Sequence, residues 1–428
     1  MYLGIAFISG CKSVGSAGVY GSIIGCTYIL VVSAFCTYLL LKARNRFKNR
    51  EVIDLADLAR LLFGETACKI LGFLIVVANS CFLIIYCMFI GFNMDQLMCK
   101  TWEYAECRNN NLYVGIILIL LAPAYCQRTL KNVGFFSAFV LAFTLVGLIV
   151  ILYVCRGIIT EKQKAGTLDE QISVDWAYIP VFISMMNSLF EGNQQILNVY
   201  AETDKPQNFV RTAFITIGFL MTCVAIPISF IGIIAFGNDM ESVIIYNLPY
   251  HDTLSIITRI CFVMTISGSF VLLCQPVFHV IESTTFYTTG KFTSEPSQIY
   301  DADNEENDFA HKIFEEWSTQ RWVKHILVRC FTSFTLWFIS TVIPNLHIFL
   351  TLVGGLTGTI INVWIPVIFY NRAYNASEKN ISKESAKQPL MGDGGEEAKD
   401  NRALIRQLSW VVFMTGTFTG AIGIYHAI

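Results

Sequence analysis

The sequence predicts an all-α integral membrane protein with about eleven transmembrane helices. Of its 428 residues, 54% are hydrophobic and only 14% are charged, whereas soluble domains carry about 25% charged residues. The mean hydropathy is positive. The charges fall in short clusters between apolar runs of about 20 residues, which is the helix length that crosses a hydrocarbon core. We therefore expect a lipid bilayer to surround most of the chain.

Ten apolar runs are long enough to span a membrane, and the third is the weakest. They cover residues 19–41, 70–92, 110–126, 133–155, 177–199, 212–236, 254–281, 325–343, 346–370 and 407–427. An eleventh, partial segment runs from Met1 to about Gly15 and is interrupted by Lys12. No positive charge precedes its apolar stretch, which disfavours a signal peptide.

The positive charges predict the orientation of these spans, because loops rich in Lys and Arg stay in the cytoplasm. If the ten spans alternate, 22 of the 30 Lys and Arg residues fall in one set of loops and six in the other. Residues 42–69 are then cytoplasmic, and the carboxyl terminus is outside or lumenal. The net charge of -2 gives no reason to expect nucleic acid as a partner.

The loops predict no separate soluble domain. Residues 283–324 and 371–406 form the longest cytoplasmic loops, and both contain too little apolar material to fold by themselves. We therefore expect one transmembrane domain over residues 1–428 with two flexible loops. The sequence contains no nucleotide-binding glycine loop, nucleophile elbow or metal-spaced cysteine or histidine cluster. We expect neither an enzyme nor a cofactor.

Two of the fourteen cysteines, Cys99 and Cys107, share the outside loop 93–111. At a cell surface this loop faces an oxidising compartment, so a disulfide between them is a reasonable hypothesis. Most of the other cysteines lie within apolar spans, where they behave as small hydrophobic residues.

The span 177–199 is the most polar of the ten, and its polar residues crowd its second half. A carboxylate such as Glu191 costs on the order of 3 kcal/mol near the middle of a span, so it needs a partner or a function. Gly192 beside it is a natural place for the helix to unwind. If the helix opens at 189–192, its free backbone groups can bind the carboxylate and ammonium of a zwitterion. The alternative is a polar helix end that leaves the membrane.

Thr265 and Ser267 are the polar residues of the span 254–281 that are candidates for an ion path. The alternative, favoured for each residue alone, is packing of small residues between helices. Arg259 and Glu282 lie near opposite ends of this span, and we expect both to reach the membrane surfaces with their charged groups.

Several motifs together resemble the amino acid/auxin permease family of eukaryotic amino acid transporters. They include Phe190-Glu-Gly192, Lys205-Pro-Gln-Asn-Phe209, Tyr246-Asn-Leu-Pro249 and Leu352-Val-Gly-Gly355. The segments 58–64, 275–282, 343–345 and 417–420 also resemble the corresponding parts of the family. The resemblance extends over nearly the whole chain from about Gly15.

The resemblance implies a fold of eleven helices with two inverted five-helix repeats, whose first members are broken at the substrate site. It implies symport of small amino acids, driven by a proton or sodium gradient. The substrate candidates are Gly4, Ser188, Phe190, Glu191, Gly192 and Asn193, and the ion candidates are Thr265 and Ser267. The membrane is then the plasma membrane or that of a vacuole or lysosome.

The start of the chain departs from the family pattern. Residues 12–15 resemble the turn of the family's first helix, but no proline precedes them and the preceding half-helix is missing. The sequence therefore predicts a truncated first helix, either because translation begins upstream or because this is a natural short form.

Two other functional classes stay open. A non-transporting sensor of the same fold would bind an amino acid and signal through a loop such as 283–324. A receptor or channel on another helical fold is disfavoured by the number of spans and by the lack of a filter-like repeat. No protein partner is predicted.

Overall fold

A computed structural model describes most of the chain. The described residues are 5–47, 55–101, 110–126, 133–165, 176–188, 196–201, 206–220, 224, 226–237, 240–241, 243–287, 319–343, 345–375 and 396–427. The chain divides into two compact units. The first comprises Met1–Ala78, Thr144–Cys261 and Asn345–Ile428, and the second comprises Asn79–Phe143 and Phe262–Pro344. The boundaries fall inside three helices, and the division does not test the predicted single domain.

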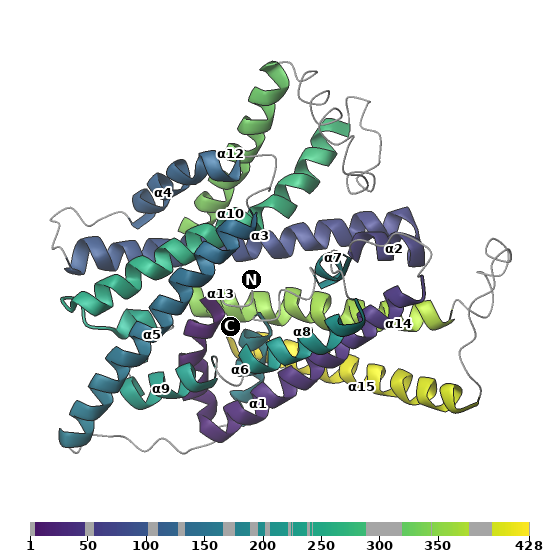
Figure 1. The fold of residues 1–428 in the computed structure, drawn as a ribbon, viewed down its shortest axis with the longest axis horizontal. Coiled ribbons are helices and arrows are strands. Elements are labelled where there is room, and N and C mark those ends of the chain that lie inside the picture. Colours follow the sequence, from purple (N-terminus) through teal and green to yellow (C-terminus); the bar gives the residue numbers. More distant parts are fainter. Residues whose placement is uncertain are drawn as a thin grey trace. The chain divides into compact units, whose positions relative to one another are not determined.

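The part of the chain that the structure describes is helical and contains no strand (Figure 1). Its α-helices are α1 (Ile5–Asn45), α2 (Leu55–Phe63), α3 (Glu65–Asp95), α4 (Asn110–Tyr125), α5 (Val133–Ala165), α6 (Ile179–Asn187), α7 (Ile196–Ala201), α8 (Pro206–Leu220), α9 (Ile226–Phe236), α10 (Thr253–Tyr287), α12 (Thr319–Val342), α13 (Leu346–Val353), α14 (Ile365–Asn375) and α15 (Glu396–Ala427). Four shorter turns are the π-helices η1 (Gln96–Thr101), η6 (Gly354–Gly358) and η7 (Ile360–Trp364) and the 3₁₀-helix η5 (Ile244–Asn247).

Seven helical stretches of the described residues are long and apolar enough to cross a membrane. They are Tyr20–Asn45, Glu65–Cys99, Ser137–Ala165, Thr253–Phe278, Val323–Val342, Leu346–Tyr374 and Ala403–His426. Each overlaps one of the ten predicted spans. On α12 the side chains of Phe331 and Val342 are 72% and 70% exposed, as expected for apolar groups that face lipid. The total of eleven helices and the inverted repeat stay predictions.

The other three predicted spans correspond to shorter helices. The run 110–126 matches α4, which has 16 residues. The run 177–199 contains α6 and the start of α7. The run 212–236 is divided between α8 and α9, with 221–223 and 225 outside the described residues. Pro227 lies in the first turn of α9, where its missing N–H needs no helical partner.

Helix α1 contains a kink at Gly18, which has φ 75° and ψ 164°. Only glycine adopts this backbone conformation without strain. The kink separates the predicted partial segment, which ends near Gly15, from the span predicted to start at residue 19. Figure 1 shows the two arms of α1 meeting at this bend.

The helices next to the two long loops extend further than the sequence predicts. Helix α10 continues to Tyr287 and α12 begins at Thr319, so the ends of the predicted loop 283–324 are helical. In the same way α14 continues to Asn375 and α15 begins at Glu396 within the predicted loop 371–406. The remainder of both loops lies outside the described residues, and their predicted flexibility stays a prediction.

The first unit has two main apolar clusters. In one, α1 packs against α6 and α9 through residues such as Ala17, Ile29, Phe182 and Ile233. In the other, the end of α1 packs against α2, α7 and α14. Helix α2 contributes one apolar face, Leu55, Leu58, Ala59 and Leu62, while Arg60 on its other side pairs with Glu65 at 3.0 Å.

The sequence predicts that Arg259 extends its charged group toward a membrane surface, and in the structure this side chain is 0% exposed within the first unit. Its guanidinium donates to the carbonyls of Leu248 at 2.7 Å, Pro249 at 3.3 Å and Ile245 at 3.4 Å, and it lies over the ring of Tyr250. These acceptors belong to the loop that follows α9, so hydrogen bonds from Arg259 connect this loop to α10. Glu282 lies in α10, and its side chain lies outside the described residues.

The second unit packs mainly through large side chains. Trp337 of α12 lies against Gly115 of α4, where an added Cβ would be 3.4 Å from the indole. The ring of Tyr125, at the end of α4, contacts Phe270 and Phe278 of α10. Arg329 is buried here and donates to the Tyr125 carbonyl at 2.7 Å and to Gln275 Oε1 at 3.3 Å. It thereby satisfies a carbonyl that the end of α4 leaves without a helical partner.

Candidate functional site

Helix α6 ends at Asn187, in the middle of the predicted span 177–199. It begins with Pro180 in its first turn, and every residue from Val181 to Met186 is buried. Ser188 caps its end: the Ser188 backbone N–H donates to the Met185 and Met186 carbonyls, and Ser188 Oγ donates to Met185 O at 2.6 Å. The next helix, α7, begins at Ile196, and residues 189–195 lie outside the described residues.

The π-helix η6 approaches the backbone of α6 directly. A Cβ added to Gly354 would overlap the Ser184 carbonyl oxygen, and a Cβ on Gly358 would lie 3.0 Å from Asn187 Nδ2. Asn187 Nδ2 donates to the Gly354 carbonyl at 3.2 Å. Two consecutive π-helical turns, η6 and η7, are unusual within a span, and such turns are frequent at functional sites.

Helix α15 also contacts α6 through small residues. A Cβ on Gly423 would overlap Ser184 Oγ, and one on Gly420 would lie 2.6 Å from Thr359 Oγ1. Ser184 Oγ donates to the Thr419 carbonyl at 3.2 Å. Glycine and hydroxyl residues therefore let α6, η6 and α15 meet at their backbones, a packing mode typical of membrane helices.

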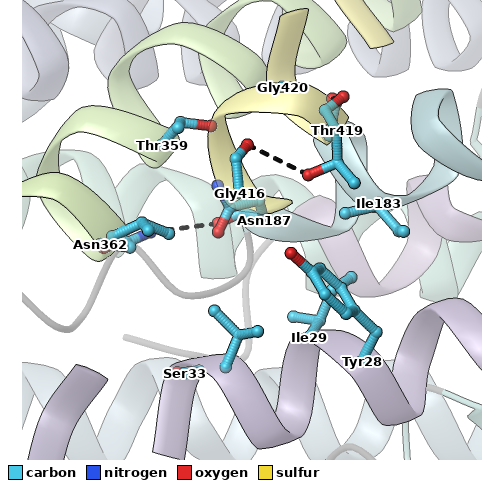
Figure 2. A pocket seen from close by; sticks show the side chains of 13 residues that line it. Tyr28, Ile29, Ser33, Ile183, Asn187, Thr359, Asn362, Gly416, Thr419 and Gly420 are labelled. Atoms are coloured by element: carbon cyan, nitrogen blue, oxygen red, sulfur yellow. Dashed lines mark hydrogen bonds between the residues drawn. The ribbon is translucent and has the colours of Figure 1, made fainter. Parts of the chain in front are cut away.

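A small pocket lies where α1, α6, η7 and α15 meet (Figure 2). It is lined by Tyr28, Ile29, Val32, Ser33, Ile183, Ser184, Asn187, Thr359, Asn362, Val363, Gly416, Thr419 and Gly420. Figure 2 shows Tyr28 and Ser33 on α1 across from Asn187 and Asn362. Among the described residues it leaves about 20 Å³ for the centre of a water molecule, which is room for one water.

The exposed lining of the pocket is mostly apolar, with hydroxyl and amide side chains among its residues, and among the described residues no Asp, Glu, His, Lys, Arg or Cys lines it. The side-chain amides of Asn187 and Asn362 each donate a hydrogen bond to a backbone carbonyl. Asn187 Nδ2 donates to the Gly354 carbonyl, and Asn362 Nδ2 donates to the Asn187 carbonyl at 3.4 Å. Asn362 is 3% exposed, and its Oδ1 has no hydrogen-bond partner in the structure. Since α6 ends here, its last carbonyls add negative potential to the pocket.

The structure describes three of the eight residues predicted to bind substrate or ion. Gly4, Phe190, Glu191, Gly192 and Asn193 lie outside the described residues. Ser188 is 4% exposed and adjoins the pocket residue Asn187. Thr265 and Ser267 are both buried in the second unit, and neither is among the residues that line the pocket. Their predicted roles stay predictions.

Cys99 is disulfide-bonded. Cys107 lies outside the described residues, so the pairing of these two cysteines stays a prediction.

Sequence reasoning missed the pocket formed by Ser33, Thr359 and Asn362. Each of these residues is one polar position in a long apolar run, and such positions are common in membrane helices for packing alone. The signal in the sequence was the glycine-rich segment around Gly354, which carries part of the family resemblance but no polar side chain that would mark a site.

Residues 3–391 match the profile of a protein family described as "Transmembrane amino acid transporter protein". The chain belongs to this family. The resemblance to amino acid transporters in the sequence is thereby confirmed, as is the prediction of a multi-pass membrane protein. The family is named for transport, in agreement with the prediction that the chain is not an enzyme.

The chain is also similar to "Vacuolar amino acid transporter 4" of Saccharomyces cerevisiae. The two sequences are 22% identical over 279 residues, which is 65% of this chain and 38% of the relative. The chain therefore matches well under half of the length of that relative.

Proposed function

We propose that this protein carries amino acids across a membrane by alternating access. The observation that carries the proposal is the family profile, which covers residues 3–391 and thus nearly all of the predicted spans. The yeast relative is named as a vacuolar amino acid transporter, which supports the same substrate class and favours an internal membrane over the plasma membrane.

The end of α6 supports a substrate site in the adjoining residues. The last carbonyls of a helix attract positive charge, and in many transporters the broken ends of helices near the bilayer midplane bind substrate groups. Helix α6 ends at Asn187 within a predicted span. An amino acid ammonium group bound after α6, with Glu191 nearby to orient it, fits this arrangement.

We further propose that transport is a symport of small amino acids with H⁺ or Na⁺. Thr265 and Ser267 are the candidates for contact with the ion. Both are buried polar residues of α10, which is compatible with an ion path.

The proposal is tested by uptake of a panel of radiolabelled amino acids into proteoliposomes, with proton and sodium gradients imposed separately. We expect uptake of small amino acids that rises when one of the two gradients is imposed. Binding of an amino acid without uptake under either gradient would favour the sensor and contradict transport.

Glu191 is tested in the same assay by Glu191→Gln. We expect this variant to lose at least about tenfold in uptake, since a lost charged contact costs about 1.5–3 kcal/mol. The matched control is Glu161→Gln, because Glu161 is an exposed carboxylate near the end of α5. Uptake by Glu191→Gln equal to that of the control would remove Glu191 from the mechanism.

A further inference from the structure

Three candidate spans of the first unit meet at one edge of it. Tyr20–Asn45 and Leu346–Tyr374 end there, and Ala403–His426 begins there. Near these ends α1, α14 and α15 pack into one apolar cluster, whose members include Tyr38, Leu39, Val367, Tyr370, Tyr374 and Ile405. The ends of membrane spans lie at the level of the lipid headgroups, so this edge of the unit faces a membrane surface.

Each of the three helices carries a basic side chain at this edge. Lys42 lies in the last turn of α1, and Arg46 follows one turn later, just after the helix ends. Arg372 lies in the last turn of α14, and Arg406 follows the cluster residue Ile405 on α15. The edge therefore brings four positive charges to the level of the headgroups.

Aromatic side chains order the two cations of α1. Lys42 Nζ donates to the hydroxyl of Tyr38 at 2.9 Å, and the guanidinium of Arg46 lies 4.8 Å from the centre of the Tyr374 ring. A lysine ammonium has three N–H donors and a guanidinium has five, so contacts with one hydroxyl and with a ring face use few of them. Side chains that are already ordered lose less freedom when they bind a ligand.

Hydrogen bonds connect the turns that carry the two other cations. Asn371 Nδ2 donates to Ser409 Oγ at 3.1 Å, and Ser409 Oγ donates to the Arg406 carbonyl at 2.8 Å. Arg372 directly follows Asn371, and its guanidinium lies 5.5 Å from the centre of the Phe63 ring. The ends of α14 and α15 are therefore fixed to each other where their arginines lie.

The helices at this edge carry little negative charge. Helices α1 and α14 contain no Asp or Glu, and neither do residues 403–427 of α15. The acidic residues of α15 precede its candidate span, and their side chains lie outside the described residues; they are Glu396, Glu397 and Asp400. Like charges one turn apart, as at Lys42 and Arg46, repel each other. An anion bound at the membrane surface would relieve this repulsion.

We propose that this edge binds the phosphate of an anionic membrane lipid through Lys42, Arg46 and Arg406. Basic pockets between membrane helices bind lipid headgroups, and anionic lipids are enriched in the cytoplasmic leaflet, the side predicted for residues 42–69. Because the cations lie at the ends of the spans, the phosphate next to the glycerol is at their level. Phosphatidic acid fits best, since its phosphate is a monoester that can carry two negative charges. This binding does not depend on the proposed transport.

The proposal is tested by thermal unfolding of the purified full chain in uncharged detergent. The additives are phosphatidic acid, phosphatidylcholine with the same acyl chains, and inorganic phosphate. We expect the unfolding midpoint to rise with phosphatidic acid, because a ligand that binds only the folded state stabilises it, and to stay constant with the other two. An equal rise with phosphatidylcholine would show an effect of the acyl chains, and an equal rise with inorganic phosphate would show a site for free phosphate. Either result would overturn the proposal.

The variant that combines Lys42→Gln and Arg406→Gln removes two of the cations. We expect it to raise the phosphatidic acid concentration for half of the midpoint shift by at least about tenfold, since each basic residue near an anionic surface contributes roughly fivefold. The matched control combines Lys162→Gln and Lys164→Gln, which removes two charges from the last turn of α5. An equal loss in both double variants would mean diffuse attraction to any basic surface and would contradict a site at this edge.

A second measurement needs no variant and covers the case in which the double variant does not fold. Native mass spectrometry of the unaltered chain, with equal amounts of phosphatidic acid and phosphatidylcholine, counts the lipids that stay bound. We expect one phosphatidic acid molecule to be retained in preference to phosphatidylcholine. Equal retention of the two lipids would overturn the proposal.

Discussion

Two helix contacts, one inside each unit, differ in kind. In the first unit, Gly354, Gly420 and Gly423 bring the backbones of η6, α15 and α6 together, and the side chains between them are small and polar. In the second unit, large groups such as Trp337 and the rings around Tyr125 fill the space between helices.

This difference has a functional consequence. Where backbones approach closely, carbonyl and hydroxyl oxygens come to lie near one another, and the remaining gap is small. Where bulky side chains meet, the same space is filled by carbon. The first unit contains a small pocket with hydroxyl and amide side chains among its lining residues, while the second unit contains apolar packing and a buried arginine at a helix end.

The largest effect is expected from filling a backbone contact of the first unit. Gly354→Leu would place a side chain on the Ser184 carbonyl and separate η6 from α6. Overpacking usually costs about 1–3 kcal/mol, and more where backbone cannot move aside. We expect a loss of more than about 3 kcal/mol, seen as a lower thermal midpoint or as aggregation in size-exclusion chromatography.

The matched control for this substitution is Gly72→Leu in α3. A Cβ at Gly72 meets nothing within 4 Å, and leucine favours a helix over glycine by about 0.5–1 kcal/mol. We expect no loss of stability. If both leucine variants were equally unstable, close backbone contact would not be what distinguishes the first unit.

A somewhat smaller effect is expected from Arg259→Ala in the first unit. This change removes the buried donor of the Leu248 and Pro249 carbonyls and one of the donors of the Ile245 carbonyl, which still accepts from the Leu248 N–H. At about 1–3 kcal/mol for an unsatisfied buried group, partly relieved by water, we expect a loss of about 3 kcal/mol. Thermal unfolding measures it, with Arg156→Ala at an exposed position as the neutral control.

Arg329→Ala makes the corresponding test in the second unit. Arg329 satisfies the Tyr125 carbonyl and lies 5.1 Å from the centre of the Phe278 ring. Gln275 also donates to this carbonyl, at 3.2 Å, so we expect a smaller loss than for Arg259, about 2 kcal/mol. Lys324→Ala, on the exposed side of the same helix, is the control. A larger loss than at Arg259 would reverse the order that hydrogen bonding predicts.

The smallest loss of stability is expected at Tyr200, whose aromatic ring contacts α1 within the first unit. Its hydroxyl donates to Asn45 Oδ1 at 3.1 Å, and its ring lies 4.4 Å from the guanidinium of Arg44. Tyr200→Phe removes only the hydroxyl bond, worth about 1 kcal/mol, and keeps the ring contact. Tyr200→Leu removes both and should lower the unfolding midpoint further. Equal midpoints for the two variants would show that the ring contact contributes nothing.

The ends and interruptions of helices were harder to predict from sequence than their existence. The run 254–281 is a helix as expected, but α10 continues to Tyr287 because polar residues can extend a helix beyond the apolar run. The break near Gly18 fell at the predicted boundary, since a glycine there permits a positive φ. The π-turns of 354–364 had no counterpart in the predictions, because no pattern in the sequence marks them; in the structure η6 lies against α6.

Arg259 shows why side-chain environments could not be predicted. At a span end, an arginine ordinarily reaches toward water, which is what the sequence predicted. The three carbonyls that bury it belong to residues 10 to 14 positions earlier, and a sequence pattern does not show that this loop folds back.

The sequence by itself determined that this chain crosses a membrane and belongs among amino acid transporters, because apolar length and distributed motifs are local properties of the chain. Only the tertiary structure decided that Asn362, Asn187 and Ser33 share one pocket. These residues lie far apart along the chain. They meet because glycines on other segments allow the helices to approach, and no single segment encodes that approach.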